Sequence, residues 1–211
     1  FMVRKKLNVK NAKGLNGATV CVETGTTTEK NLADWFRTNK LQFKALTFEG
    51  NDPTRNAYEA GRCDAYTTDA SGLAASRMIM KDPNEHVILP DIISKEPLGP
   101  MTRHGDNQWT DIVRWVYNIT VIAEEKGITH ANVDQMKSSE DPEVKRILGV
   151  TDTVGPDMGL PQDFAVKALK TSGNYGEIFE RNIGPKTPLR LERGLNALWT
   201  NGGLQYVPPV R

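Results

Sequence analysis

The stretch Ala18-Thr-Val-Cys-Val-Glu-Thr-Gly-Thr-Thr-Thr-Glu29 decides the fold of the N-terminal half of this chain. Residues 18–23 are rich in β-branched side chains and predict a strand. After a tight, threonine-rich turn, Leu32, Trp35 and Phe36 recur at the spacing of one helical face. A strand, a tight turn and a helix in this order are typical of an α/β sheet.

The segments that follow repeat this order. The predicted strands cover 43–48, 64–69 and 87–89, and the predicted helices cover 52–61 and about 70–80. Strands that alternate with helices indicate crossover connections between parallel neighbours. We therefore expect a parallel, three-layer α/β sheet within residues 8–93.

The second half of the chain has a different pattern. Apolar residues from Trp109 to Ala123 share one face and predict a long amphipathic helix over 108–126, which ends at Gly127. Shorter helices are predicted over 132–138, 142–148, 161–170 and 174–182. These helices need a layer to pack against, and residues 104–211 show no strand pattern. Part of the fold is therefore expected to lie outside this chain.

Composition excludes several classes of protein. The 211 residues include 27 basic and 26 acidic side chains, which alternate along the chain and leave no basic block for nucleic acid. No apolar run approaches the roughly 20 residues that a membrane span needs. Residues 1–6 lack the features of a signal peptide, so this N-terminus does not indicate the compartment.

The residues most often used in catalysis or metal binding form no recognisable motif. The three histidines, at 86, 104 and 130, are scattered, so we expect no metal and no cofactor. No G-x-S-x-G nucleophile motif occurs. Cys21 and Cys63 lack C-x-x-C spacing, and the pattern fits two buried thiols as well as one disulfide.

The threonine-rich turn is the first candidate binding feature. Thr26 and Glu29 match a capping box, which places the start of a helix at the sheet edge. The amides of Thr27 and Thr28, together with the helix dipole, then favour an anionic group. The alternative is that the threonines only cap the helix.

Two acidic residues lie at the ends of predicted strands. Asp69 ends the third strand, so its carboxylate is expected at the same sheet edge as the threonine turn, unless it only caps the next helix. An amino acid would satisfy both features, with its ammonium on Asp69 and its carboxylate on the amides. Glu23, at the end of the first strand, would face the variable part of the ligand or remain a solvated charge.

Five segments carry a resemblance to a known family. Residues 17–29, 60–69, 93–99, 174–184 and 194–206 closely resemble the general L-amino-acid-binding proteins of ABC transporters. The resemblance covers essentially the whole chain and implies a type II periplasmic-binding fold, with one complete βαβ lobe and a helical C-terminal part of the other lobe. It assigns 1–7 and 94–103 to two hinge-crossing strands, 8–93 to the second lobe and 104–211 to the first.

The same resemblance implies roles for individual residues. Thr26, Thr27 and Thr28 would contact the α-carboxylate of the ligand, Asp69 its ammonium, and Glu23 and Thr28 its side chain. It further implies a periplasmic protein without enzymatic activity, made as a precursor with a signal peptide, which hands a free L-amino acid to the permease subunits of an ABC importer.

The resemblance also exposes a difference from the family. Family members have an N-terminal portion of the first lobe that this chain does not contain, so we expect a second chain, an N-terminal fragment or disordered residues to complete that lobe. Two other classes of function stay open: a dehydratase-like enzyme on the same fold, and the ligand-sensing domain of a regulator or receptor.

Overall fold

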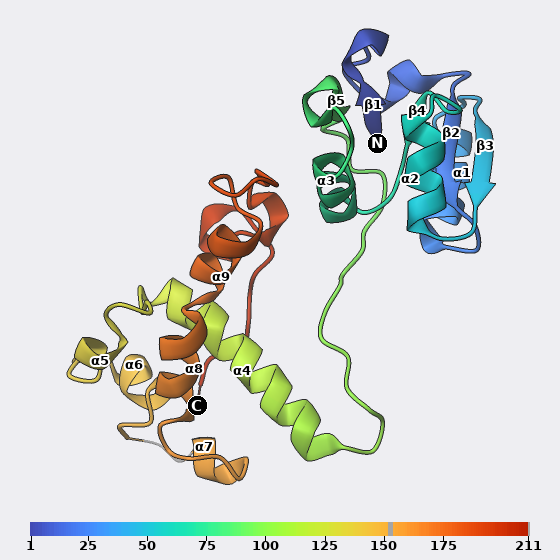
Figure 1. Cartoon of the computed structure of the whole chain (residues 1–211). Coiled ribbons are helices and arrows are strands. Elements are labelled where there is room, and N and C mark those ends of the chain that lie inside the picture. Colours follow the sequence, from blue (N-terminus) through green and yellow to red (C-terminus); the bar gives the residue numbers. More distant parts are fainter. Residues whose placement is uncertain (152–153, 211) are drawn as a thin grey trace. The chain divides into compact units, whose positions relative to one another are not determined.

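A computed structural model describes residues 1–151 and 154–210 of the chain (Figure 1). These residues form two compact units, Phe1–Leu98 (unit 1) and Gly99–Arg211 (unit 2). Unit 1 is a mixed α/β unit built on a sheet, and unit 2 consists of helices and irregular segments among its described residues.

The sheet of unit 1 has five strands in the order β3-β2-β4-β1-β5. The strands are β1 (Met2–Arg4), β2 (Thr19–Glu23), β3 (Lys44–Phe48), β4 (Ala65–Tyr66) and β5 (His86–Ile88). Strand β2 runs parallel to β3 and β4, as the sequence predicted. The strands of residues 8–93 therefore all run in one direction, as predicted, and β1, which precedes this range, is inserted between β4 and β5 and runs antiparallel to both.

Three helices cover the two faces of this sheet. They are α1 (Thr27–Thr38), α2 (Asn51–Glu59) and α3 (Ala70–Met78), and short 3-10 turns lie at Lys5–Leu7, Ala12–Leu15 and Pro83–Glu85. Leu32 and Phe36 of α1 pack against one sheet face with Val20 and Val22. Helices α2 and α3 cover the other face, in a core that includes Cys21 and Tyr66. The three-layer prediction is therefore confirmed.

The two cysteines are joined in a disulfide. Cys21 lies on β2, Cys63 lies just before β4, and their Cα atoms are 5.6 Å apart. Both side chains are buried in the core beneath α2 and α3. The bond closes a sequence separation of 42 residues and fixes α2 and its flanking loops to the sheet. The sequence left open whether the cysteines are two buried thiols or one disulfide, and the structure shows the disulfide.

The segment 94–103, which we expected to be a returning strand, makes no ladder hydrogen bonds to any described strand. Its backbone hydrogen bonds are local: the Leu98 N–H donates to the Glu96 carbonyl, and the Arg103 carbonyl accepts from the Asp106 N–H. A strand is defined by its pairing with a neighbour, so this segment is irregular in the structure. The hinge roles of 1–7 and 94–103 stay predictions.

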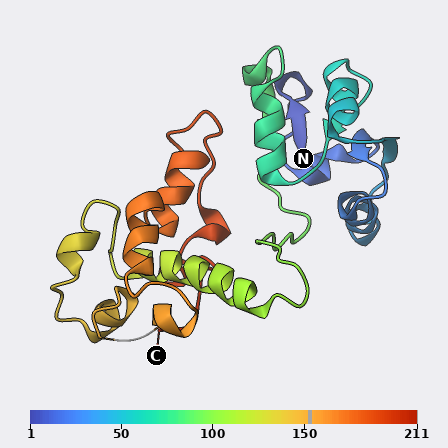
Figure 2. The ribbon, with the colours of Figure 1, turned by 60° about the horizontal axis from the view of Figure 1, so that its bottom comes forward.

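Unit 2 is organised around one long helix. Helix α4 (Asn107–Glu125) packs beside α8 (Phe164–Ser172) and α9 (Tyr175–Asn182), shown yellow-green and orange in Figure 2. The shorter elements are α5 (Val133–Met136), α6 (Pro142–Ile147), α7 (Val154–Asp157) and 3-10 turns at Gly194–Asn196 and Trp199–Asn201. The predicted helices are confirmed, and α7 is a single additional turn that the sequence did not predict.

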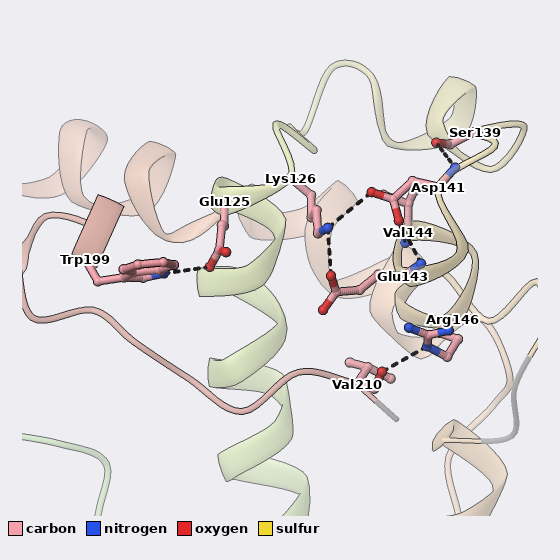
Figure 3. Close-up of polar contacts among 9 residues, drawn as sticks. All are labelled: Glu125, Lys126, Ser139, Asp141, Glu143, Val144, Arg146, Trp199 and Val210. Carbon is pink, nitrogen blue, oxygen red and sulfur yellow. Dashed lines mark hydrogen bonds and ion pairs between the residues drawn. The ribbon is translucent and has the colours of Figure 1, made fainter. Parts of the chain in front are cut away.

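Polar contacts tie the end of α4 to α6 (Figure 3). Lys126 follows α4, and its Nζ lies 2.7 Å from Glu143 and 3.2 Å from Asp141. Asp141 also caps α6 by accepting a hydrogen bond from the Glu143 N–H at 2.8 Å. The hydrogen bond to Glu143 raises the pKa of Lys126 above its usual value, so the lysine stays charged at neutral pH.

The buried His86 should make the stability of unit 1 depend on pH. The His86 Nδ1 lies 2.9 Å from the Tyr58 hydroxyl, and burial, followed by the Arg4 charge, lowers the pKa of His86 below 6.5. The unfolded chain therefore binds the proton first, and stability falls as the pH drops from about 6.5 toward the folded-state pKa. Thermal unfolding between pH 8 and 5 should show this loss of stability, and H86Q should reduce it. If the unfolding temperatures of the parent and of H86Q fell equally with pH, the assignment to His86 would be contradicted.

Candidate functional site

The ends of β2 and β4 bring the predicted binding residues to one edge of the sheet. The two strands are parallel neighbours, with Cys21 paired to Tyr66, and the Thr67 N–H donates to the Cys21 carbonyl at 3.1 Å. The carboxyl ends of parallel strands meet at the same edge, where ligands bind in open α/β sheets. Glu23, Thr26, Thr27, Thr28 and Asp69 at this edge are called the sheet-edge site.

Thr26 has a structural task in this turn. Its Oγ1 donates to the Glu23 carbonyl at 2.8 Å and accepts from the Glu29 N–H at 3.2 Å, so it caps α1. Glu29 completes the turn by accepting from the Gly25 N–H at 2.7 Å, where φ is +73° and favours glycine. The capping interpretation is therefore confirmed for the Thr26 hydroxyl, which shapes the turn.

The next two amides remain available. Thr27 and Thr28 occupy the first turn of α1, where backbone N–H groups have no partner inside the helix. No described residue accepts a hydrogen bond from either amide. Thr27 is exposed and Thr28 is half-buried. With the positive end of the α1 dipole, these amides form a place for a carboxylate or another small anion.

Asp69 differs from Thr26 in how it is used. It occupies the N-cap position of α3, but its side chain makes no capping hydrogen bond, so the alternative that it caps this helix is wrong. The residue is half-buried, and its carboxylate has no hydrogen bond or ion pair with the described residues. A half-buried carboxylate without a partner fits a cationic ligand group.

Glu23 adds a second acidic group to this edge. Cys21 faces the core beneath α2 and α3, while Val20 and Val22 face α1. Because side chains alternate along a strand, Glu23 lies on the α2 and α3 side. It is half-buried, and no described side chain pairs with its carboxylate. The residues predicted from the sequence thus lie at one edge of the sheet. The amides of Thr27 and Thr28 and the carboxylates of Glu23 and Asp69 have no hydrogen-bond partner among the described residues there.

The described residues contain neither a metal-ligand cluster nor a membrane-spanning helix. Residues 1–151 and 154–210 contain no group of three or more histidine, cysteine or acidic side chains placed to hold a metal ion. Within the same residues, no helix combines the length and apolar character required to cross a membrane.

This geometry is that of an open α/β lobe that presents two amides and a carboxylate, none with a partner among the described residues, at one edge of its sheet. Among curated proteins, the chain is 60% identical to the general L-amino acid-binding periplasmic protein AapJ of Rhizobium johnstonii. It is 54% identical to the glutamate/glutamine/aspartate/asparagine-binding protein BztA of Rhodobacter capsulatus. Both matches cover the whole chain, which spans 62% and 63% of the length of these relatives.

A solved structure is also similar to this chain. The chain matches an ABC transporter periplasmic binding protein from Brucella ovis with glutathione bound, at a TM-score of 0.93 and 52% identity, over 100% of this chain and 67% of that one. No protein-family model matches the sequence. The chain belongs to the family of ABC-transporter periplasmic binding proteins.

Proposed function

We propose that this protein captures free L-amino acids in the periplasm and delivers them to the permease of an ABC importer. The observation that carries the proposal is the pairing of opposite binding groups at one sheet edge. The unbonded amides of Thr27 and Thr28 suit an α-carboxylate, and the unpaired Asp69 suits an α-ammonium. A free amino acid carries both groups on one carbon.

The relatives support the same class of ligand. AapJ is named for binding L-amino acids in general, and BztA for binding glutamate, glutamine, aspartate and asparagine. Their names describe solute-binding proteins, which favours binding without turnover over the dehydratase-like alternative. A binding protein works by changing shape when its ligand selectively stabilises one form, and the permease would recognise that form.

Exposed apolar side chains on unit 2 support the proposal that a further segment packs against its helices. Several large apolar side chains are solvent-exposed there: Met101, Trp109, Leu195, Trp199, Leu204 and Tyr206. Covering apolar surface contributes about 25 cal/mol per Å². We propose that the remainder of the first lobe covers this surface, whether it belongs to the same polypeptide or to another chain.

Calorimetric titration of the protein with a panel of L-amino acids tests the proposed function. We expect micromolar or tighter binding for at least one of them, which corresponds to about −8 kcal/mol. The D-enantiomers serve as the control, because they cannot place the ammonium, the carboxylate and the side chain on the same three contacts. Failure of every L-amino acid to bind would reject the proposal.

A further inference from the structure

The last residues of unit 1, 94–98, begin the connection that leads to unit 2. Ile93, just before them, packs against the core cluster that contains Leu32 of α1. Within the described part of the chain, residues 94–98 make one side-chain hydrogen bond: the Glu96 Oε1 accepts from the Asn31 Nδ2 at 3.0 Å. This contact is therefore the polar anchor that holds the connection on α1.

The anchor lies close to the sheet-edge site. Asn31 follows Thr28 by three residues and Thr27 by four, which is the spacing of neighbours one turn apart on a helix. Asn31 and Glu96 are both half-buried, so the hydrogen bond between them is partly shielded from water. The connection is thus held one helical turn from the amides proposed to bind the α-carboxylate of the ligand.

Asn31 does not shape the helix that contains it. Asparagine is a poor helix former, because its side chain competes for backbone hydrogen bonds. Asn39, at the end of α1, makes a bond of this kind, and its Nδ2 donates to the Trp35 carbonyl at 2.9 Å. Asn31 makes no such bond with the described backbone and donates to Glu96 instead. The use of asparagine at this position is therefore explained by the connection and not by α1.

We propose that the Asn31–Glu96 hydrogen bond is a latch that sets the direction in which the connection leaves α1 and so favours the form that captures the ligand. The inference rests on the proposed function and adds two positioning residues to it. When only a fraction of a protein is in its binding-competent form, the apparent dissociation constant rises in inverse proportion to that fraction. Without the latch the connection samples other directions, and the ligand is bound more weakly.

Titration with the two tightest-binding members of the L-amino acid panel measures the latch. N31A and E96A should each weaken binding by about fivefold, which is less than the loss of a fully buried hydrogen bond to a charged group. N31A/E96A should lose no more than either single variant, because the same contact is removed in all three. E96Q should bind as the parent does, since its side-chain oxygen still accepts from Asn31.

The sign of the change separates the latch from a simple charge effect. If Glu96 acted on the ligand only through its charge, E96Q and E96A would both strengthen binding, because each removes a negative charge that repels the ligand carboxylate. That result would overturn the latch. Additive losses in N31A/E96A would overturn it as well, since independent residues do not share one contact.

N39A is the matched control. It removes an asparagine of the same helix whose side chain is bonded to α1 itself, so it should lower the unfolding temperature and leave ligand binding unchanged. N31A should unfold close to the temperature of the parent, because alanine is the better helix former. An equal loss of binding in N31A and N39A would indicate a general effect of α1 and would refute the latch.

Limited proteolysis tests the latch without ligand. Lys95 is exposed and directly precedes Glu96, so trypsin needs the connection to leave α1 before it can bind this segment. N31A keeps the sequence around Lys95 and should be cleaved after it about fivefold faster than the parent, in proportion to the open population. Equal cleavage would overturn the latch. A parent that shows the expected difference but binds no L-amino acid would reject the proposed function, while the contact between α1 and the connection would stand.

Discussion

D69N should lower the affinity for every L-amino acid ligand by about 100-fold or more. Removing one partner of a desolvated charge pair costs about 2–5 kcal/mol, and each 1.4 kcal/mol corresponds to a factor of about ten in affinity. The change keeps the size of the side chain and removes only its charge. Because Asp69 makes no capping hydrogen bond, the variant should unfold at the parent's temperature. Titration calorimetry and thermal unfolding measure the two quantities.

D34N is the matched control for this experiment. Asp34 lies on α1 in the same unit and forms an exposed ion pair with Arg37. Its loss should change neither binding nor, by more than about 0.5 kcal/mol, stability. If D69N bound L-amino acids as tightly as D34N, the proposed ammonium contact would be refuted.

Removing the disulfide should have the largest effect on stability. A cross-link across 42 residues restricts the unfolded chain, and loop-closure entropy places its contribution at about 4 kcal/mol. The double variant C21A/C63A should therefore unfold at a clearly lower urea concentration. Unit 1 should lose this stability, since both cysteines lie in its core and unit 2 contains no cysteine.

Chemical reduction gives the corresponding control. In excess reductant, the parent protein should unfold at nearly the same urea concentration as C21A/C63A. The unfolding of the variant should not change with the reductant. Trp35 is the one tryptophan of unit 1, so a form that keeps only this tryptophan would report on unit 1 alone. Identical midpoints for the oxidised parent and the double variant would contradict the proposed contribution.

Much of the fold could be predicted because its strongest elements are periodic. The β-branched run at 18–23 and the helical spacing of Leu32 and Phe36 are enough to identify β2 and α1 from the sequence alone. The family resemblance assigned a strand to 1–7, but the antiparallel pairing of β1 could not be predicted, since three residues show no direction of pairing. Helix α7 is one turn containing Pro156, too short for a periodic signal.

The candidate site was predictable in position but not in the state of its groups. Strand ends indicated where Thr26 and Asp69 would lie, and both residue types are also common helix caps. Only the contacts separate them: Thr26 uses its hydroxyl to cap α1, whereas Asp69 leaves its carboxylate unused.

The position of β1 between β4 and β5 makes unit 1 useful for protein engineering. The Leu89 N–H donates to the Phe1 carbonyl at 2.7 Å, so the beginning of unit 1 and the strand near its end lie next to each other. A unit whose first and last strands are neighbours can be spliced into a surface loop of a host protein through short connections. Unit 1 is therefore suited to being grafted as a cassette, for example between the halves of a fluorescent reporter, provided that Met2 to Arg4 are kept.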